Sequence, residues 1–423
     1  MLRRHPRHRR TGGCSSPFVF GLEGPLRLKG GSEQALGRRR PSPQVASILP
    51  VQRFEALGDR LRAFARPWEF ACFICVPAIV VAFAGWEELK ARLALEDFGI
   101  FRTASLAVIH GHSPYVAPNP SAYMHFDRFV YPPVAALLFA PFAAVPSGPS
   151  SALMFAAGVI AILAALRVLG VQDWRCYGVA LISAPAINSI ALGTLTSFLL
   201  LGTALCWRYR DNPAAAGVAT AVTALLKLFL WPLGVWLLVT RRWRAAIICA
   251  CTGLILLVGG WAVIDFAGLR SYPTILHVLQ QIEIPVSYSL VGLLGLSGGT
   301  ATAVTVGLSL AAIVAIWSAA RGAGGDRRAF AVAVVVSLAT TPLLWMHYLL
   351  LLFVPIAFYR PRLSGLWFLP WLLWLTPSSN SHGETWRIVL ALVVVAIVAV
   401  RTLFASEAPA LNRAGVAPRP AAS

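Results

Sequence analysis

Residues 68–86 read WEFACFICVPAIVVAFAGW, and this run decides the class of fold. Its length is close to the roughly 20 apolar residues with which an α-helix crosses a bilayer, and similar runs recur along most of the chain. Hydrophobic residues make up 57% of the sequence and charged residues 13%, with a mean hydropathy of +0.70. Soluble domains carry about 25% charged residues. The sequence therefore predicts an all-α, polytopic membrane protein.

The segments on either side of the apolar region have a different composition. Residues 1–66 are polar, basic and rich in Gly, Pro and Ser, and we expect a disordered cytoplasmic tail with a short amphipathic helix in VQRFEALGDRLRAF (51–64). The first apolar run begins near Pro67, too late for a signal peptide, so it is expected to stay as the first span. Residues 67–405 should form one transmembrane domain, and 406–423 a second disordered tail.

The apolar runs after the first span predict about ten to twelve helices in all. The segment 214–240 has basic residues at both ends, which fits either two short helices with Lys227 at their tip or one kinked span. Arginines in the tail and in short turns place the N-terminus inside, so the loops 87–130 and 266–289 should face outward. The further spans are expected at 131–147, 150–169, 177–192, 194–208, 214–240, 244–264, 290–320, 328–358, 363–376 and 385–404.

The net charge of +19 does not indicate nucleic-acid binding, because the arginines crowd the tail and the short turns between apolar runs. That distribution is typical of a membrane protein whose basic side attracts anionic lipid headgroups. Cysteines such as Cys72 and Cys75 lie inside apolar runs, where they are expected to pack as small apolar residues. The sequence has no P-loop, G-x-G-x-x-G or H-E-x-x-H motif, and we expect neither a metal site nor a cofactor.

The stretch LALEDFGIFRTASLAVIHGHSPY (93–115) places Glu96 and Asp97 side by side in the first outward loop. An amphipathic helix along the membrane interface is predicted there, with Gly111 ending it. Asp97 lies at the edge of the apolar stripe, where burial would raise its pKa and suit it to act as a general base. A second interpretation makes Asp97 a helix N-cap and Glu96 an exposed surface charge, and the two roles of Asp97 can hold together. The stripe consists of Asp97, Ile100, Phe101, Ala104, Ala107 and Val108.

Polar and aromatic residues follow the predicted helix. His112 and Tyr115 lie in HGHSPY, and Arg128 and Tyr131 precede a span that Pro132 and Pro133 should open. The tyrosines fit either a binding site or an ordinary aromatic belt at the interface. His110 and His112 would not share a helical face, so a metal pair is not indicated.

Two ionisable residues lie within apolar sequence. Lys227, in TALLKLFLWP, is costly in lipid unless it meets water or an anion; alternatively it extends its ammonium group to the interface. His347, in PLLWMHYLLLLF, could bind a ligand or simply make a hydrogen bond between packed helices.

Several motifs, in this order, give the chain a family likeness. The acidic pair in EDFGIFRTAS, then GHSPY, YPPVAALL, the segment AGVATAVTALLKLFLWPLGVWLLVTRRWRA, SYSLVGLL and WMHYLLLLFVP resemble the motifs of glycosyltransferase family 87. The likeness covers roughly residues 68–404. Two motifs differ: family members often have Gly-Gln-x-Asn where this chain has LGTLTS, and many have Asn-Gln-Ser where Tyr288 precedes Ser289 here.

The resemblance implies a GT-C fold and an inverting transfer of a hexose or pentose, with mannose favoured, from a polyprenyl-phosphate donor. The acceptor would be a glycan or glycolipid at the outer face of the plasma membrane. It makes Asp97 the general base and Lys227 or Arg128 the group that holds the donor phosphate. The remaining candidate substrate-binding residues are Glu96, His112, Tyr115, Tyr131, Ser289 and His347.

Two other classes of function compete with an enzyme. Charged residues at membrane depth also mark transport paths, so a lipid-glycan flippase or transporter is the main alternative, and a non-catalytic membrane scaffold is the third. The outward loop with its interfacial helix and acidic pair favours the enzyme, because a transporter would carry its key charges within the spans.

Overall fold

The computed structural model describes residues 66–90, 95–116, 128–322, 324–376 and 384–403. Every regular element in these ranges is a helix, so the all-α prediction is confirmed. The predicted tails at 1–65 and 404–423, including the amphipathic segment 51–64, lie outside the described residues.

Five helices are long and apolar enough to cross a membrane, or six if a bent pair counts as one span. The first runs over Arg66–Glu88 and includes the π-helical turn η1 (Ala71–Cys75) and most of α2 (Val76–Lys90). The others are α7 (Ser147–Val168), α13 (Trp243–Ala262), α16 (Gly298–Ala319) and α19 (Thr385–Leu403). The bent pair is α9 (Ala184–Ala191) with α10 (Thr196–Arg208), at 115°.

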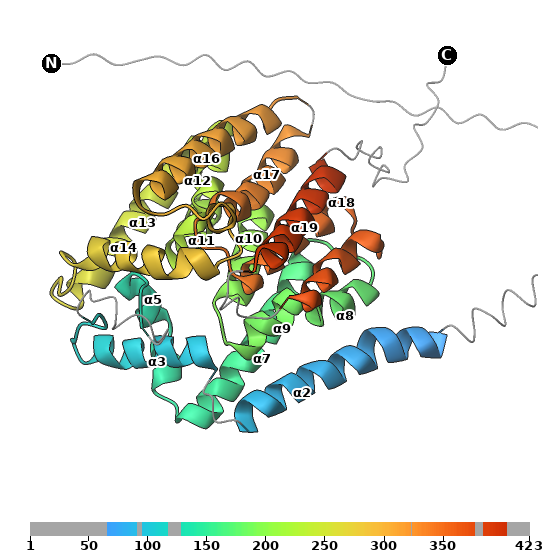
Figure 1. Ribbon diagram of the computed structural model, residues 1–423, viewed down its shortest axis with the longest axis horizontal. Coiled ribbons are helices and arrows are strands. Elements are labelled where there is room, and N and C mark those ends of the chain that lie inside the picture. Colours follow the sequence, from blue (N-terminus) through green and yellow to red (C-terminus); the bar gives the residue numbers. More distant parts are fainter. Residues whose placement is uncertain (1–65, 91–94, 117–127, 323, 377–383, 404–423) are drawn as a thin grey trace, which may run out of the picture. The chain divides into compact units, whose positions relative to one another are not determined.

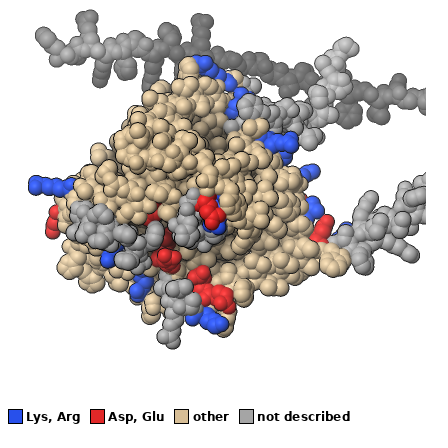
Figure 2. Space-filling model, in the orientation of Figure 1, with Lys and Arg blue, Asp and Glu red and all other residues tan. Residues whose placement is uncertain are grey.

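The long helices keep much of their apolar surface exposed. Ile79 of α2 is 66% exposed and Ile255 of α13 is 69% exposed. Large areas of the face in Figure 2 carry neither acidic nor basic side chains. Lipid tails rather than water are the medium that suits such a surface, and the chain is a multi-pass membrane protein.

The remaining helices are shorter, because proline and glycine divide several apolar runs. The predicted span 131–147 consists of α5 (Pro133–Leu138) and α6 (Ala140–Ala143), with Pro141 at the start of α6. The run 290–320 is α15 (Leu290–Leu293) and α16, separated at Gly295 (φ +61°). The long helices are therefore fewer than the apolar runs predicted. The shorter helices are α3 (Glu96–Ile109), α5 (Pro133–Leu138), α6 (Ala140–Ala143), α8 (Arg175–Leu181), α11 (Pro213–Leu226), η2 (Leu228–Leu230), α12 (Pro232–Val239), α14 (Tyr272–Glu283), η3 (Ile284–Val286), α15 (Leu290–Leu293), α17 (Gly325–Thr340), η4 (Met346–Leu352), α18 (Phe353–Tyr359) and η5 (Gly365–Leu375).

The segment 214–240 forms a hairpin of two short helices. Helix α11 ends at Leu226, and Lys227 is extended before η2 and α12 begin. The two outer ends of the hairpin meet, since Nε of Arg242 donates to the carbonyl of Arg210 at 3.0 Å. Lys227 therefore lies at the tip, and the alternative of one kinked span is wrong.

Helix α3 lies beside α5 and α6, as Figure 1 shows. The rings of Phe101 and Phe139 stack at 4.7 Å, and Phe98 packs edge-on against Phe142. The buried residues Phe101, Ala104 and Val108 belong to the predicted stripe. Gly111 follows the helix with φ +72° and donates to the carbonyl of Val108. The predicted amphipathic helix and its glycine end are confirmed.

The two predicted outward loops pack against each other. The hydroxyl of Tyr272 in α14 donates to the carbonyl of Val130 at 3.0 Å. Tyr115 stacks on Trp261 at the end of α13, with ring centroids 5.3 Å apart. The loops after α2 and after α13 thus lie at one end of the helices and together surround the region described next.

Candidate active site

The start of α3 fixes the position of Asp97. Leu95 precedes the helix with φ +37°, and no side chain caps the first turn. The amides of Asp97 and Phe98 instead donate to the carbonyl of Leu192, at 3.1 and 3.3 Å. Asp97 is the second residue of α3, so its backbone, rather than its carboxylate, secures the helix start. The N-cap interpretation is wrong, and the partly buried carboxylate makes no hydrogen bond with the described residues.

Gly193 allows this close approach between α3 and the turn after α9. Its φ is +65°, a backbone conformation that is unfavourable for residues other than glycine. A Cβ on Gly193 would lie 2.8 Å from Cβ of Phe98 and 2.9 Å from Cβ of Leu95. The glycine in LGTLTS therefore sets where Asp97 lies.

Lys227 projects from the tip of the α11–α12 hairpin toward two tyrosines. Its Nζ donates to the hydroxyl of Tyr131 at 2.5 Å and also to the hydroxyl of Tyr348. A lysine ammonium group has three donors, and the third has no partner among the described residues. Lys227 is thus held in place by two tyrosine hydroxyls while keeping one donor for a ligand.

Glu283 is a site residue that the sequence analysis missed. It ends α14 and is only 5% exposed, and its Oε2 atom is buried without a hydrogen-bond partner. A buried carboxylate oxygen without a partner is costly, so this oxygen is a candidate acceptor for a ligand. The sequence feature that could have identified it is that Glu283 is the sole acidic residue between 266 and 289.

The charges of Asp97, Lys227 and Glu283 interact with one another. Burial raises the pKa of Asp97 to about 6; Lys227 opposes that rise and Glu96 adds to it. Burial likewise raises the pKa of Glu283 to about 7, with Asp97 adding to the rise and Lys227 opposing it. The three ionisable groups are therefore close enough to influence one another's charge.

His347 directly precedes Tyr348 in η4. It is 6% exposed, and its Nδ1 lies 3.3 Å from Oδ1 of Asn188, which is 8% exposed. Its ring meets that of Tyr348 edge to face at 4.7 Å. His347 thus packs helices together and also orients a tyrosine that contacts Lys227.

Tyr115 supports the site from the side. Its hydroxyl donates to the backbone carbonyl of Tyr131 at 2.7 Å, and its ring packs against those of Trp261 and Tyr272. A Cβ on Gly268 would come within 2.9 Å of this ring. The contacts of Tyr115 position Tyr131, and through it Lys227.

The other predicted site residues are Glu96, His112, Arg128 and Ser289. Glu96 is exposed and acts on Asp97 through its charge. His112 and Arg128 are exposed at either end of the segment that lies outside the described residues. Ser289 is buried, and its hydroxyl caps α15 by accepting from the amide of Gly292 at 3.0 Å.

The arrangement suits transfer between two oxygen atoms. A carboxylate without hydrogen bonds can take a proton, and a fixed ammonium group can stabilise a leaving anion. Within the described ranges, no group of three or more His, Cys, Asp or Glu side chains is placed to hold a metal ion.

Comparison with known proteins shows the same kind of chemistry. A polyprenol-phosphate-mannose-dependent alpha-(1-2)-phosphatidylinositol pentamannoside mannosyltransferase of Mycolicibacterium smegmatis is 26% identical over 314 residues, 65% of this chain and 75% of that protein. An alpha-(1->3)-arabinofuranosyltransferase of Mycobacterium tuberculosis is 30% identical over 145 residues, 29% of this chain and 33% of that protein. No solved structure matches the chain.

The model of glycosyltransferase family 87 matches residues 129–346. This range contains Tyr131, Lys227 and Glu283, whereas Asp97 precedes it. The match and the mannosyltransferase relative support glycosyltransferase activity in a multi-pass membrane protein. The chain belongs to glycosyltransferase family 87.

Proposed function

We propose that this membrane glycosyltransferase moves mannose from a polyprenyl-phosphate donor to a glycan or glycolipid acceptor at the outer face of the plasma membrane, with inversion at the anomeric carbon. The observation that carries the proposal is the pairing of an Asp97 carboxylate without hydrogen bonds with a Lys227 ammonium group that has a donor left over.

In the proposed reaction, Asp97 accepts the proton of an acceptor hydroxyl. The oxygen attacks the anomeric carbon from the side opposite the phosphate, and the bond from that carbon to the phosphate oxygen breaks as the new bond forms. The electron pair leaves on the phosphate, where Lys227 stabilises the growing charge. The tyrosine hydroxyls keep the ammonium group at one position, which lowers the cost of reorganisation during the reaction.

Glu283 has a separate role in this proposal. Its unpartnered Oε2 atom accepts hydrogen bonds from sugar hydroxyls and so orients the ring that is transferred. A carboxylate is a strong acceptor for hydroxyl donors, and its burial makes a missing hydroxyl costly. Glu283 therefore helps to select the sugar.

Two further observations support the donor and the outward orientation. The Mycolicibacterium smegmatis relative is named for its dependence on polyprenol-phosphate-mannose. The short turns at the other end of the helices carry arginines, including Arg241, Arg242 and Arg244, and basic turns lie mostly in the cytoplasm. The loops that hold Asp97 and Glu283 are then extracytoplasmic.

The test compares donors with the purified protein in lipid vesicles. Radiolabelled mannose is presented either as polyprenyl-phosphate mannose or as a nucleotide sugar, together with a glycolipid extract as acceptor. We expect labelled product from the polyprenyl-phosphate donor alone. Transfer from the nucleotide sugar, or movement of the intact labelled donor across the bilayer without product, would overturn the proposal.

A further inference from the structure

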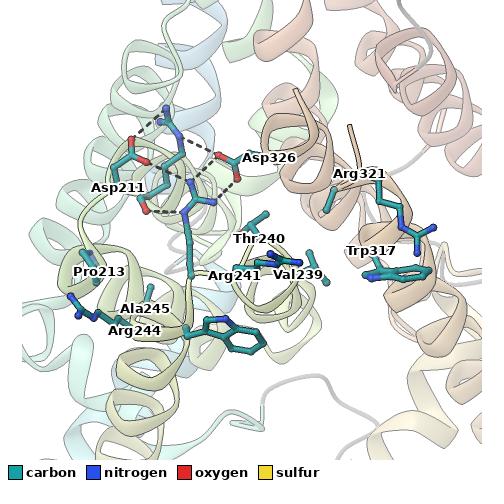
Figure 3. A pocket seen from close by; sticks show the side chains of 14 residues that line it. Asp211, Pro213, Val239, Thr240, Arg241, Arg244, Ala245, Trp317, Arg321 and Asp326 are labelled. Carbon is teal, nitrogen blue, oxygen red and sulfur yellow. Dashed lines mark hydrogen bonds and ion pairs between the residues drawn. The ribbon is translucent and has the colours of Figure 1, made fainter. Parts of the chain in front are cut away.

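A second charged region lies where the turns α10–α11, α12–α13 and α16–α17 meet. These turns surround a cavity of about 1220 Å³, seen in Figure 3. Five arginines and two aspartates are among the residues that line it, which leaves a formal excess of three positive charges. The cavity is therefore strongly basic, and no part of the proposed reaction uses it.

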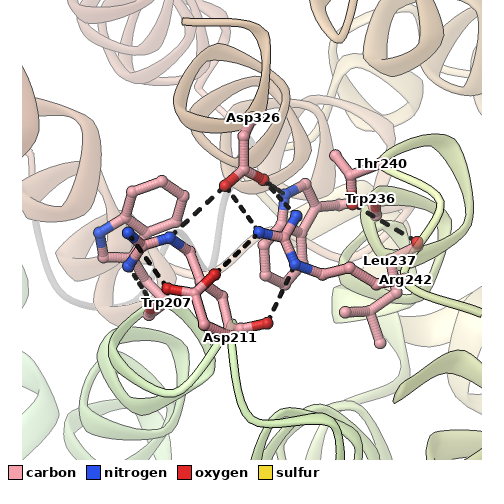
Figure 4. A network of polar contacts seen from close by, with 8 residues as sticks. Trp207, Asp211, Trp236, Leu237, Thr240, Arg242 and Asp326 are labelled. Atoms are coloured by element: carbon pink, nitrogen blue, oxygen red, sulfur yellow. Dashed lines mark hydrogen bonds and ion pairs between the residues drawn. The ribbon is translucent and has the colours of Figure 1, made fainter. Parts of the chain in front are cut away.

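Two of the arginines are already neutralised. Asp326 at the start of α17 forms ion pairs with Arg242 at 2.7 Å and with Arg210 at 3.5 Å, and Asp211 lies 3.5 Å from Arg242. Figure 4 shows this network, in which Nε1 of Trp236 also donates to Asp326 at 3.0 Å. These contacts tie the three turns together and give the cavity a fixed wall.

Three arginines keep their charge available. Arg241, Arg244 and Arg321 are exposed and make no hydrogen bond or ion pair with the described residues. Arg241 adopts a φ of +59°, a backbone conformation that residues other than glycine rarely adopt. The guanidinium carbon of Arg321 lies 3.2 Å from the ring centre of Trp317, so a cation–π contact positions this arginine.

The cavity lies at the opposite membrane face from Asp97. Helix α13 begins at Trp243, which lines the cavity, and its other end carries Trp261, which stacks on Tyr115 of the first loop. A helix of 20 residues is about 30 Å long, close to the thickness of the hydrocarbon core. The cavity is thus a separate site.

We propose that this cavity binds the phosphate headgroup of an anionic phospholipid from the adjoining leaflet. Guanidinium groups match phosphate oxygens in charge and geometry, and basic pockets between membrane helices are typical lipid-headgroup sites. Trp243 is 58% exposed and Trp317 is 49% exposed, and tryptophans prefer the membrane–water interface. The acyl chains would lie along the exposed apolar surfaces of α13 and α16. Inorganic phosphate offers the same headgroup chemistry without the chains.

The test counts lipids bound to the intact protein in a non-ionic detergent by native mass spectrometry. Phosphatidylglycerol and phosphatidylcholine with matched chains are titrated separately. We expect phosphatidylglycerol to bind at least about tenfold more tightly, because each basic residue near an anionic headgroup contributes roughly fivefold. Equal binding of the two lipids to the wild-type protein would overturn the proposal whatever the variants show.

The triple variant Arg241→Gln, Arg244→Gln and Arg321→Gln removes the available charges and leaves the Asp326 network intact. It should lose the preference for phosphatidylglycerol. The control variant Arg167→Gln, Arg208→Gln and Arg401→Gln removes three exposed arginines that do not line the cavity. It should keep the preference for phosphatidylglycerol. Loss of the preference in both variants would show that overall charge, not this cavity, is responsible.

Inorganic phosphate and glycerol phosphate separate a lipid site from a free-anion site. Neither should displace bound phosphatidylglycerol at equal concentration, because they lack the acyl chains. If either compound displaced bound phosphatidylglycerol as effectively as added phosphatidylglycerol does, the result would contradict a lipid site. None of these measurements depends on sugar transfer.

Discussion

The two ends of the membrane helices use charge in opposite ways. At the Asp97 end, an ammonium group and two carboxylates lie partly or wholly buried, and neither carboxylate forms an ion pair with a described residue. At the Asp326 end, Arg210 and Arg242 form ion pairs with Asp211 and Asp326, and these four side chains remain at least one-fifth exposed. Buried ionisable groups without an ion-pair partner are typical of reactive sites, whereas ion pairs near the surface connect turns to one another. Substitutions at the first end should therefore change turnover, and those at the second should change stability or lipid binding.

Removal of the ammonium group should give the largest loss of activity outside the base itself. Lys227→Ala leaves the departing phosphate without its cation, and we expect a fall in turnover of roughly 10²–10³-fold, the range for one preorganised donor. Lys227→Arg should restore little, because a planar guanidinium group does not fit between the hydroxyls of Tyr131 and Tyr348. Initial rates of mannose transfer measure both.

The matched control is Arg208→Ala, which removes an exposed positive charge at the end of α10 that does not line the cavity. Its transfer rate should stay near that of the parent. A collapse in the amount of folded protein for Lys227→Ala would instead identify the lysine as structural, and its role at the phosphate would be abandoned.

Glu283→Gln sharpens the comparison within the active end. It keeps the shape of the side chain and weakens its hydrogen bonds to sugar hydroxyls, so we expect about a 10- to 100-fold loss in kcat/KM, as for one charged hydrogen bond. Discrimination against a donor sugar that lacks the contacted hydroxyl should shrink. Unchanged discrimination between mannose and deoxy-mannose donors would remove Glu283 from sugar selection.

Asp326→Asn should show the reverse pattern. It weakens the contacts to Arg242 and Arg210, and we expect a loss of about 1 kcal/mol in the free energy of unfolding, since the carboxylate is one-third exposed. The rate of transfer by the folded protein should be unaffected. Thermal unfolding in detergent and transfer assays on the same preparation test this, and a fall in turnover with unchanged stability would break the division between the two ends.

The pH dependence should follow the base. Burial raises the pKa of Asp97 to about 6, so the carboxylate becomes protonated, and inactive as a base, as the pH falls through 6. We expect log kcat/KM to rise with pH through about 6 as Asp97 ionises, and to level off only above about 7, where Glu283 has also ionised. An ordinary aspartate would place the first change near pH 4. The profile for Glu96→Gln should shift slightly to lower pH, because one neighbouring negative charge is lost.

Much of this site was visible in the sequence, because ionisable residues stand out in apolar surroundings. This contrast identified Asp97, Lys227 and His347. Tyr131 was identified by its place directly before the predicted helix start at Pro132 and Pro133. Glu283 is also an isolated acidic residue, but it lies in a predicted loop. The sequence therefore did not indicate that the packing of α14 would bury it. The role of Gly193 depends on an approach between segments almost 100 residues apart along the chain, which hydropathy does not encode.

The fold shows a similar limit. The apolar runs predicted which residues enter the membrane, but not where each helix breaks. Prolines at 141 and 185 lie in the first turns of short helices, and the hairpin at Lys227 is recognised only by the meeting of its basic ends. Average hydropathy over a window is insensitive to such single residues.

The measurement that tests the central claim most directly is transfer by Asp97→Asn, with thermal stability recorded on the same protein. Since the backbone amides at 97 and 98 hold the start of α3, the variant should fold as well as the parent. It lacks only the basic oxygen, so turnover should fall roughly 10²–10⁴-fold, while Glu96→Gln changes it little. An Asp97→Asn protein as active as the parent would contradict the assignment of Asp97 as the general base.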